Sequence, residues 1–149
     1  MNTLSSGGGP SLAERLAAID ERVADAARRA GRESEHITRI VVTKFHPASL
    51  VHDLAALGVR DVAENRQQEL TAKRTEPADD ATLAGVRWHF VGQAQTNKGR
   101  QIRAAADAVH SVDRARLVTA LDAAAPGSDP VLDVLLQVSL DPRGADHRS

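Results

Sequence analysis

From residue 37 onward, short runs of β-branched residues alternate with longer runs rich in alanine and leucine, and this alternation constrains the fold more than any other feature. The pattern is typical of repeated βα units around a parallel sheet. The positions at the predicted strand ends follow one another at alternating steps of 21 and 27 residues, which favours one sheet built from one kind of unit; they are Lys44, Asn65, Gly92, Asp113 and Leu140. The predicted strands are Arg39–Lys44, Val59–Glu64, Arg87–Val91, Ala108–Val112 and Leu132–Leu140. The predicted helices are Ala48–Leu57, Arg66–Thr75, Asn97–Ala106 and Arg114–Ala124, the last with Asp113 as its N-cap.

The N-terminal region predicts a flexible tail over residues 1–11, followed by one amphipathic helix. Ser11 is a suitable N-cap, apolar residues then recur every three or four positions, and Gly31 is a natural end. A chain of 149 residues with 42% hydrophobic content suffices for a single domain with a core. We therefore expect one domain over residues 12–149.

Two α/β architectures fit five strands in this length. One is an open, doubly wound five-stranded sheet of the flavodoxin type. The other is the N-terminal part of a (β/α)8 TIM barrel, which when complete needs about 250 residues. Both place functional groups at the carboxyl ends of the strands, which here means Lys44, Glu64 with Asn65, Gly92, and residues 111–113.

Composition argues against several classes of function. The net charge is −1, and the basic cluster of Lys98, Arg100 and Arg103 lacks an aromatic platform, so we expect no nucleic-acid binding. The six histidines show no metal-ligand spacing, and no metal site is predicted. No run is apolar enough for a membrane span, and no secretory signal is apparent. The absence of cysteine suits a reducing compartment, so the expected location is cytoplasmic.

Five ordered segments carry a family resemblance: "VVTKFHPA", "VAENRQQE", "WHFVGQAQTNKGR", "VHSVDR" and "VLLQVSL". In order and spacing they resemble the pyridoxal phosphate homeostasis family, also called the proline synthetase co-transcribed or alanine-racemase-like N-terminal family. The resemblance covers roughly Leu12 to Asp141. It implies a barrel of the alanine racemase N-terminal type that holds pyridoxal 5′-phosphate as an internal aldimine, a Schiff base, on Lys44.

The resemblance also implies other residues near the cofactor. Asn65 matches the asparagine of the family's "GEN" segment and is expected beside the cofactor ring; its alternative role is a helix N-cap. His89 and Ser111 are further candidates for cofactor contact, or are satisfied within the protein. The family usually has glycine at the position of Ala63, and other residues at the positions of Gln93 and Ala94.

Lys44 can also be read as an ordinary solvated lysine at a strand end. An amine attacks an aldehyde only when it is neutral, and a free lysine has a pKa of about 10.4. A covalent role therefore requires surroundings that lower this pKa, and we expect Phe45 to roof the amine and supply part of the desolvation.

The function implied by the resemblance is that of a carrier or buffer of pyridoxal phosphate, with PLP-dependent apoenzymes as partners and no catalytic residue. Racemisation needs a second base on the opposite cofactor face, and the sequence identifies none. Two alternatives stay open: an amino-acid racemase-like fragment, and an inactive truncated fragment.

The last residues resemble the family's loop after the fifth strand, whereas the family continues through three more strands that include its phosphate-binding segment. Losing three charge-assisted hydrogen bonds, each worth about 1.5–3 kcal/mol, would weaken cofactor retention by a factor on the order of 10³ to 10⁶. We therefore expect weak cofactor retention, marginal stability, and association through the open barrel edges.

Overall fold

The structure is a computed structural model that describes residues 9–75, 81–125, 127 and 130–140. Two compact units are present, one up to Arg39 and the other from Ile40 onward. The tail predicted for residues 1–11 lies mostly outside the described residues, and both it and the single domain over 12–149 stay predictions. No helix in the described part of the chain is both long enough and apolar enough to cross a membrane.

The first unit contains α1 (Leu12–Arg29) and the short 3-10 helix η1 (Ser34–His36). Ser11 is the N-cap, as predicted: its hydroxyl accepts from the backbone N–H of Glu14, whose carboxylate accepts from the backbone N–H of Ser11. At the other end Gly31 has a φ of 64°, the left-handed conformation that commonly terminates a helix. Only Leu16 and Ala27 of this helix are buried, so most of the predicted apolar stripe is not.

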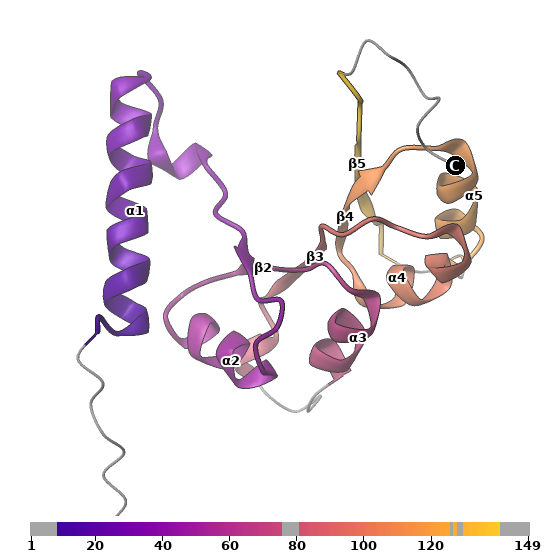
Figure 1. Ribbon diagram of the computed structural model, residues 1–149, viewed down its shortest axis with the longest axis horizontal. Helices are drawn as coiled ribbons and strands as arrows, with labels where there is room; N and C mark the ends of the chain where they lie inside the picture. The colour runs from indigo at the N-terminus through magenta and orange to yellow at the C-terminus, as the bar shows by residue number, and fades with distance from the viewer. Residues whose placement is uncertain (1–8, 76–80, 126, 128–129, 141–149) are drawn as a thin grey trace, which may run out of the picture. The chain divides into compact units, whose positions relative to one another are not determined.

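The second unit is built around five parallel strands in the order β1-β2-β3-β4-β5. The strands are β1 (Val41–Val42), β2 (Asp61–Glu64), β3 (Arg87–Phe90), β4 (Ala108–Val112) and β5 (Asp133–Leu136). The helices are α2 (Ala48–Ala56), α3 (Gln67–Thr75), α4 (Gly99–Ala105) and α5 (Ala115–Asp122), with 3-10 turns η2 (Ala81–Leu83) and η3 (Thr96–Lys98). Figure 1 shows α2 to α5 following one another along one side of the strand series.

The strand order decides between the two predicted architectures. A doubly wound sheet reverses its strand order at a switch point, whereas these strands lie side by side in sequence order without reversal. Right-handed crossovers that all run in one direction leave every helix on the same face, as in a (β/α)8 barrel. The prediction of the N-terminal part of such a barrel is confirmed, and the open doubly wound alternative is wrong.

The core lies between the strands and these helices. Glu64 contacts Lys73 of α3, so by the two-residue period of a strand Val62 shares its helix-facing side. The strand register places Trp88 and Phe90 on that side as well. Buried apolar residues of the helices complete the core, chiefly Val51, Leu54, Leu70, Ile102, Leu117 and Leu121.

Several predicted boundaries are wrong by a few residues. The first strand was predicted as Arg39–Lys44 and is Val41–Val42, and the last was predicted as Leu132–Leu140 and is Asp133–Leu136. Both are shorter than predicted because each pairs with a neighbouring strand on only one side. Asp113 is not the predicted N-cap, since Arg114 takes that position with no side-chain capping bond. The three 3-10 turns were not predicted, because runs of three residues carry no periodic signal.

Candidate functional site

Lys44 lies two residues beyond the carboxyl end of β1, rather than as its predicted last residue, and its side chain is exposed. Its Nζ is 5.7 Å from the ring centroid of Phe45, and the Arg66 guanidinium is 5.2 Å from the same centroid. Phe45 is itself 68% exposed, so the expected desolvating roof is wrong. The ring lies near two cations on the surface and leaves the amine of Lys44 accessible from solvent.

The turn that carries Lys44 has an unusual backbone. Phe45 is the only non-glycine residue with a positive φ, 65°, among the described residues. That conformation costs a residue with a Cβ about 1–2 kcal/mol, so other contacts must hold it. Two hydrogen bonds hold the turn. The N–H of His46 donates to the carbonyl of Thr43 at 3.1 Å, and the N–H of Phe45 donates to the side-chain oxygen Oε2 of Glu69 at 3.1 Å.

A buried ion pair lies beneath this turn. Lys73 Nζ donates to Glu64 Oε1 at 2.5 Å and to the backbone carbonyl of Thr43 at 2.8 Å. The hydroxyl of Thr43 donates to the same Glu64 oxygen at 2.5 Å. Glu64 is fully buried and the Lys73 side chain is only 7% exposed, so the charges are compensated by each other rather than by water.

Asn65 lies at the end of the neighbouring strand, next to Lys44 in the sheet register. Val42 pairs with Ala63, and Lys44 and Asn65 each follow two residues later. The alternative role as N-cap does not occur, because α3 begins at Gln67 and the buried Oδ1 of Asn65 has no hydrogen-bond partner in the part of the chain that the structure describes. Asn65 lines a hollow whose other members are Arg66, Gln67, Gln68, Phe90, Gln93, Gln95, Lys98 and Ile102.

Gly92 brings the loops after β2 and β3 into close contact. A Cβ added to Gly92 would lie 2.0 Å from the backbone oxygen of Asn65, closer than any real contact. Ser111 Oγ donates to the carbonyl of Gly92 at 2.5 Å and is thereby satisfied within the protein. These contacts fix the ends of β2, β3 and β4 against one another.

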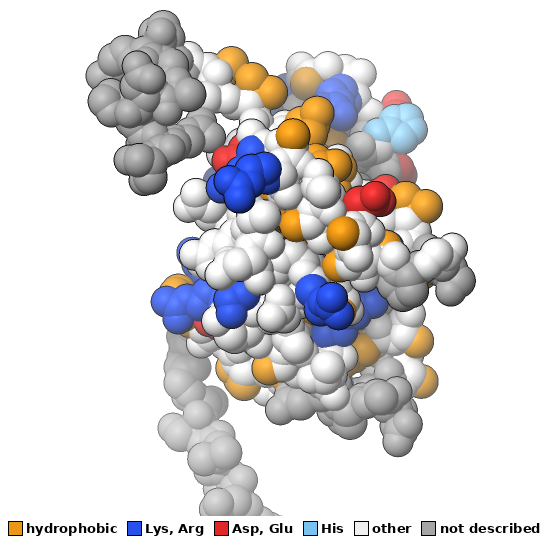
Figure 2. All heavy atoms as spheres, turned by 90° about the vertical axis from the view of Figure 1, so that its right-hand side faces the viewer, with side chains coloured by type: hydrophobic (Ala, Val, Ile, Leu, Met, Phe, Trp, Pro, Cys, Tyr) orange, Lys and Arg blue, Asp and Glu red, His pale blue; other side chains and the backbone are white. Residues whose placement is uncertain are grey.

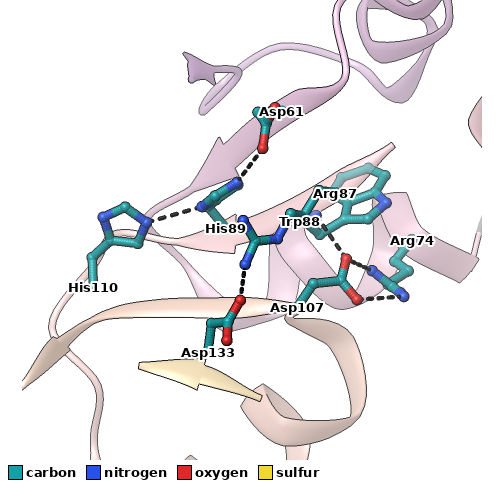
Figure 3. A network of polar contacts seen from close by, with 8 residues as sticks. All are labelled: Asp61, Arg74, Arg87, Trp88, His89, Asp107, His110 and Asp133. Carbon is teal, nitrogen blue, oxygen red and sulfur yellow. Dashed lines mark hydrogen bonds and ion pairs between the residues drawn. The ribbon is translucent and has the colours of Figure 1, made fainter. Parts of the chain in front are cut away.

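His89 lies on the sheet face opposite the helices, within a chain of polar side chains (Figure 3). Its Nε2 is 2.8 Å from Asp61 Oδ1, and its Nδ1 is 2.9 Å from His110 Nε2. Because a carboxylate only accepts, Nε2 of His89 donates to Asp61, and a neutral His89 accepts from His110. Both ring nitrogens therefore have protein partners, and cofactor contact by His89 or Ser111 stays a prediction.

His110 is the outer member of this chain of polar side chains, and both burial and neighbouring charges shift its pKa. Burial lowers the pKa of His110 below its ordinary value of 6.5, and the neighbouring His89 and Arg87 lower it further. Arg87 also pairs with Asp133 of β5, and Arg74 holds Asp107 through two bonds of 2.6 and 3.1 Å (Figure 3). Within the described ranges, no group of three side chains is arranged to hold a metal ion.

Sequence reasoning identified Lys44 and Asn65 but missed the residues that hold them. Glu64 was noted only as a strand end, and Glu69 and Lys73 were not assigned a role. One signal was available, because Glu69 and Lys73 are four residues apart and flank the buried Leu70 on α3. That spacing alone does not say what the two charges face.

No family model matches the chain. Curated relatives match it, and three of them are called pyridoxal phosphate homeostasis protein. The Mycobacterium tuberculosis H37Rv protein is 42% identical over 146 residues, covering 90% of this chain and 57% of that protein. The Pseudomonas aeruginosa PAO1 and Escherichia coli K12 proteins are 38% and 35% identical, each match covering 87% of this chain and 55% of the relative. The chain thus spans about half the length of the curated relatives it matches.

Solved structures agree with these relatives. PipY of Synechococcus elongatus PCC7942, determined without PLP, is 34% identical, with a TM-score of 0.63 over 76% of this chain and 47% of that one. The structure of PipY with PLP bound has a TM-score of 0.60 over 76% of this chain and 48% of that chain. The sequential sheet described above is therefore similar to about half of a larger fold.

Proposed function

The chain is a homologue of the pyridoxal phosphate homeostasis proteins that corresponds to about half of their length, and on this premise we propose that it binds pyridoxal 5′-phosphate through Lys44. The observation that carries the proposal is the placement of Lys44 at the carboxyl end of the first parallel strand, with its amine open to solvent. Pyridoxal phosphate supplies an aldehyde that reacts with a neutral primary amine. The PLP-bound structure of PipY supports the choice of cofactor.

The neighbouring residues fit such a ligand. Asn65 offers a buried side-chain oxygen that has no partner among the described residues, at the strand end next to Lys44. An unbonded buried acceptor costs free energy, and a ligand donor at this position would recover it. Lys44 therefore provides the attachment point and Asn65 a polar contact at the end of the next strand.

We further propose that the protein acts as a carrier rather than an enzyme, working in the cytoplasm and passing the cofactor to PLP-dependent apoenzymes. The name of the relatives supports a role in cofactor homeostasis. A racemase-like activity would need a second base across the cofactor from Lys44. Adding an amino acid in deuterated water separates the two functions: we expect no protein-dependent exchange at its Cα, whereas a racemase-like enzyme would catalyse it.

The direct test is to titrate the protein with pyridoxal phosphate, reduce it with borohydride and map the modified peptides. The chain has three lysines, Lys44, Lys73 and Lys98, of which Lys73 is buried in its ion pair. We expect modification at Lys44, saturating at one group per chain, and its loss in Lys44→Arg, which keeps the charge. Lys98→Arg is the matched control and should behave like wild type. Equal modification of Lys44 and Lys98 in wild type would contradict the proposal.

A further inference from the structure

The two peptide groups that flank Lys44 are both bonded to α3. The carbonyl of Thr43, on the N-terminal side, accepts from Lys73 Nζ at 2.8 Å, and the N–H of Phe45, on the C-terminal side, donates to Glu69 Oε2 at 3.1 Å. We propose that Glu69 and Lys73, named here the α3 clamp, are positioning residues that set the direction in which Lys44 leaves the backbone. The role deepens the proposed function and rests on it.

The Lys73 side of the clamp is anchored in the core. Its ammonium is shared between the Thr43 carbonyl and Glu64, which also accepts from the Thr43 hydroxyl. Thr43 is fully buried, and its own N–H donates to the carbonyl of Ala63 in β2 at 2.9 Å. The residue before Lys44 is therefore fixed from three directions: by the strand, by Glu64 and by Lys73.

The Glu69 side of the clamp holds the unusual backbone. Phe45 adopts a φ of 65°, which its Cβ disfavours, and the bond from its N–H to the Glu69 carboxylate favours that conformation. Glu69 is itself oriented by cations, with Lys73 Nζ 4.0 Å from Oε2 and Arg66 Nη1 3.7 Å from Oε1. The two members of the clamp thus support each other along one face of α3.

The α3 clamp restricts the backbone position from which the Lys44 side chain extends. With both flanking peptide groups fixed, only the torsions of its own side chain remain free, and its exposed amine is presented from one defined backbone position. Without the clamp, position 45 would relax toward the commoner negative φ and the direction of the Lys44 Cα–Cβ bond would change. A ligand would then have to restore the turn before it could react.

The test compares Glu69→Ala with Glu69→Gln, because glutamine keeps an oxygen that can accept from the N–H at position 45. The first measurement is amide hydrogen exchange at position 45, which needs no cofactor. We expect exchange about tenfold faster, or more, in Glu69→Ala and near the wild-type rate in Glu69→Gln. The second is the pyridoxal phosphate concentration that half-saturates Lys44 before borohydride reduction. We expect it to rise about tenfold in Glu69→Ala and to recover largely in Glu69→Gln.

Two further variants separate positioning from general stability. Phe45→Gly removes the Cβ that disfavours the turn. Glu69→Ala should therefore weaken the modification of Lys44 by pyridoxal phosphate less in the Phe45→Gly background than in the wild-type background. Glu21→Ala, which removes an exposed carboxylate from α1, is the matched control and should change neither measurement. The melting temperature of Glu69→Ala should stay close to that of wild type. If Glu69 had a merely structural role, the melting temperature would fall together with the modification of Lys44.

The outcomes distinguish this inference from the proposed function. If wild type is not modified at Lys44 but exchange at position 45 still responds to Glu69→Ala, the clamp exists, the proposed function fails, and the positioning role fails with it. If wild type is modified at Lys44 and Glu69→Ala is modified equally well, the positioning role is overturned while the proposed function stands. Unchanged exchange at position 45 in Glu69→Ala would also overturn it.

Discussion

At the scale of single residues, Glu64 and Lys73 form a buried ion pair. Both side chains are shielded from water, so the cost of burying each charge is offset by the other. Glu64 Oε2 has no hydrogen-bond partner among the described residues, and the contacts to Lys73 and Thr43 are made by Oε1. Removing one member should therefore cost far more than removing both.

We expect Lys73→Met to lower the free energy of unfolding by about 3–5 kcal/mol, because it leaves the Glu64 carboxylate buried and unpaired. Combining it with Glu64→Gln should recover a large part of this loss, since no charge is then buried. Urea denaturation of the two single variants and the double variant measures the coupling. Additive losses would show that the two charges do not depend on each other.

His110 gives a second residue-scale prediction, this time of pH dependence. Burial, His89 and Arg87 lower its pKa in the folded protein below 6.5, so the unfolded chain binds more protons just below that pH. Stability should therefore fall as the pH falls below about 6.5, down to the folded pKa. Two carboxylates contact these neighbours of His110: Asp61 is bonded to His89, and Asp133 is bonded to Arg87.

We expect His110→Gln to lose less stability than wild type between pH 7 and pH 5, because it lacks the titrating ring. Thermal melting across this range measures the effect, and the difference between the two curves reports His110 together with its coupling to His89. Parallel curves for the two proteins would contradict the assignment.

At the scale of elements, the packing of strand ends depends on one glycine. Gly92 lies against the backbone of Asn65, so a methyl group there would force apart the loops that follow β2 and β3. We expect Gly92→Ala to destabilise the protein by about 1–3 kcal/mol, measured by urea denaturation. Gly85→Ala is the matched control, because its added Cβ would meet only the flexible side chain of Arg60 at 3.8 Å. Equal effects of the two substitutions would contradict the role of this contact.

Helix ends show how far local sequence determines an element. Ser11 and Gly31 occupy the cap positions that their residue types predict, because capping involves only neighbouring backbone groups. The start of α3 was predicted at Arg66 and lies at Gln67, a shift of one residue. Asn65, a good capping residue by type, makes no hydrogen bond to the described residues through its side-chain oxygen.

At the scale of the whole molecule, the second unit has an apolar strand at its edge. All four residues of β5 are exposed, and Leu136 is 73% exposed. Figure 2 views the molecule from the right-hand side of Figure 1, the side on which α5 and β5 lie. Hydrophobic side chains are exposed on this face. In the described residues no strand pairs with the outer side of β5, and an unpaired apolar edge favours association.

We expect the protein to associate with itself as its concentration rises, and Leu136→Lys to shift the distribution toward the monomer. Analytical ultracentrifugation over a concentration series measures both. Leu57→Lys is the matched control, since Leu57 is also partly exposed but lies at the end of α2 rather than on β5. A monomeric wild type at every concentration would contradict the prediction.

The sequence by itself determined the number of strands, their parallel arrangement with intervening helices, and the placement of Lys44 and Asn65 at the ends of consecutive strands. Hydrophobic periodicity and turn residues are local signals, and the family resemblance located the same residues. The sequence did not show whether an aromatic residue is buried: Trp88 and Phe90 lie in the core, whereas Phe45 is exposed.

Only the tertiary structure decided the order of the strands, the positive φ of Phe45 and the contacts that hold the turn around Lys44. Glu69 reaches Phe45 across 24 residues, and Lys73 reaches Thr43 across 30. Contacts this distant depend on how α3 packs against β2 and β3, and no local pattern encodes that packing. The sequence places a lysine at the strand end, and the packing of the helix behind it fixes the peptide groups on either side of that lysine.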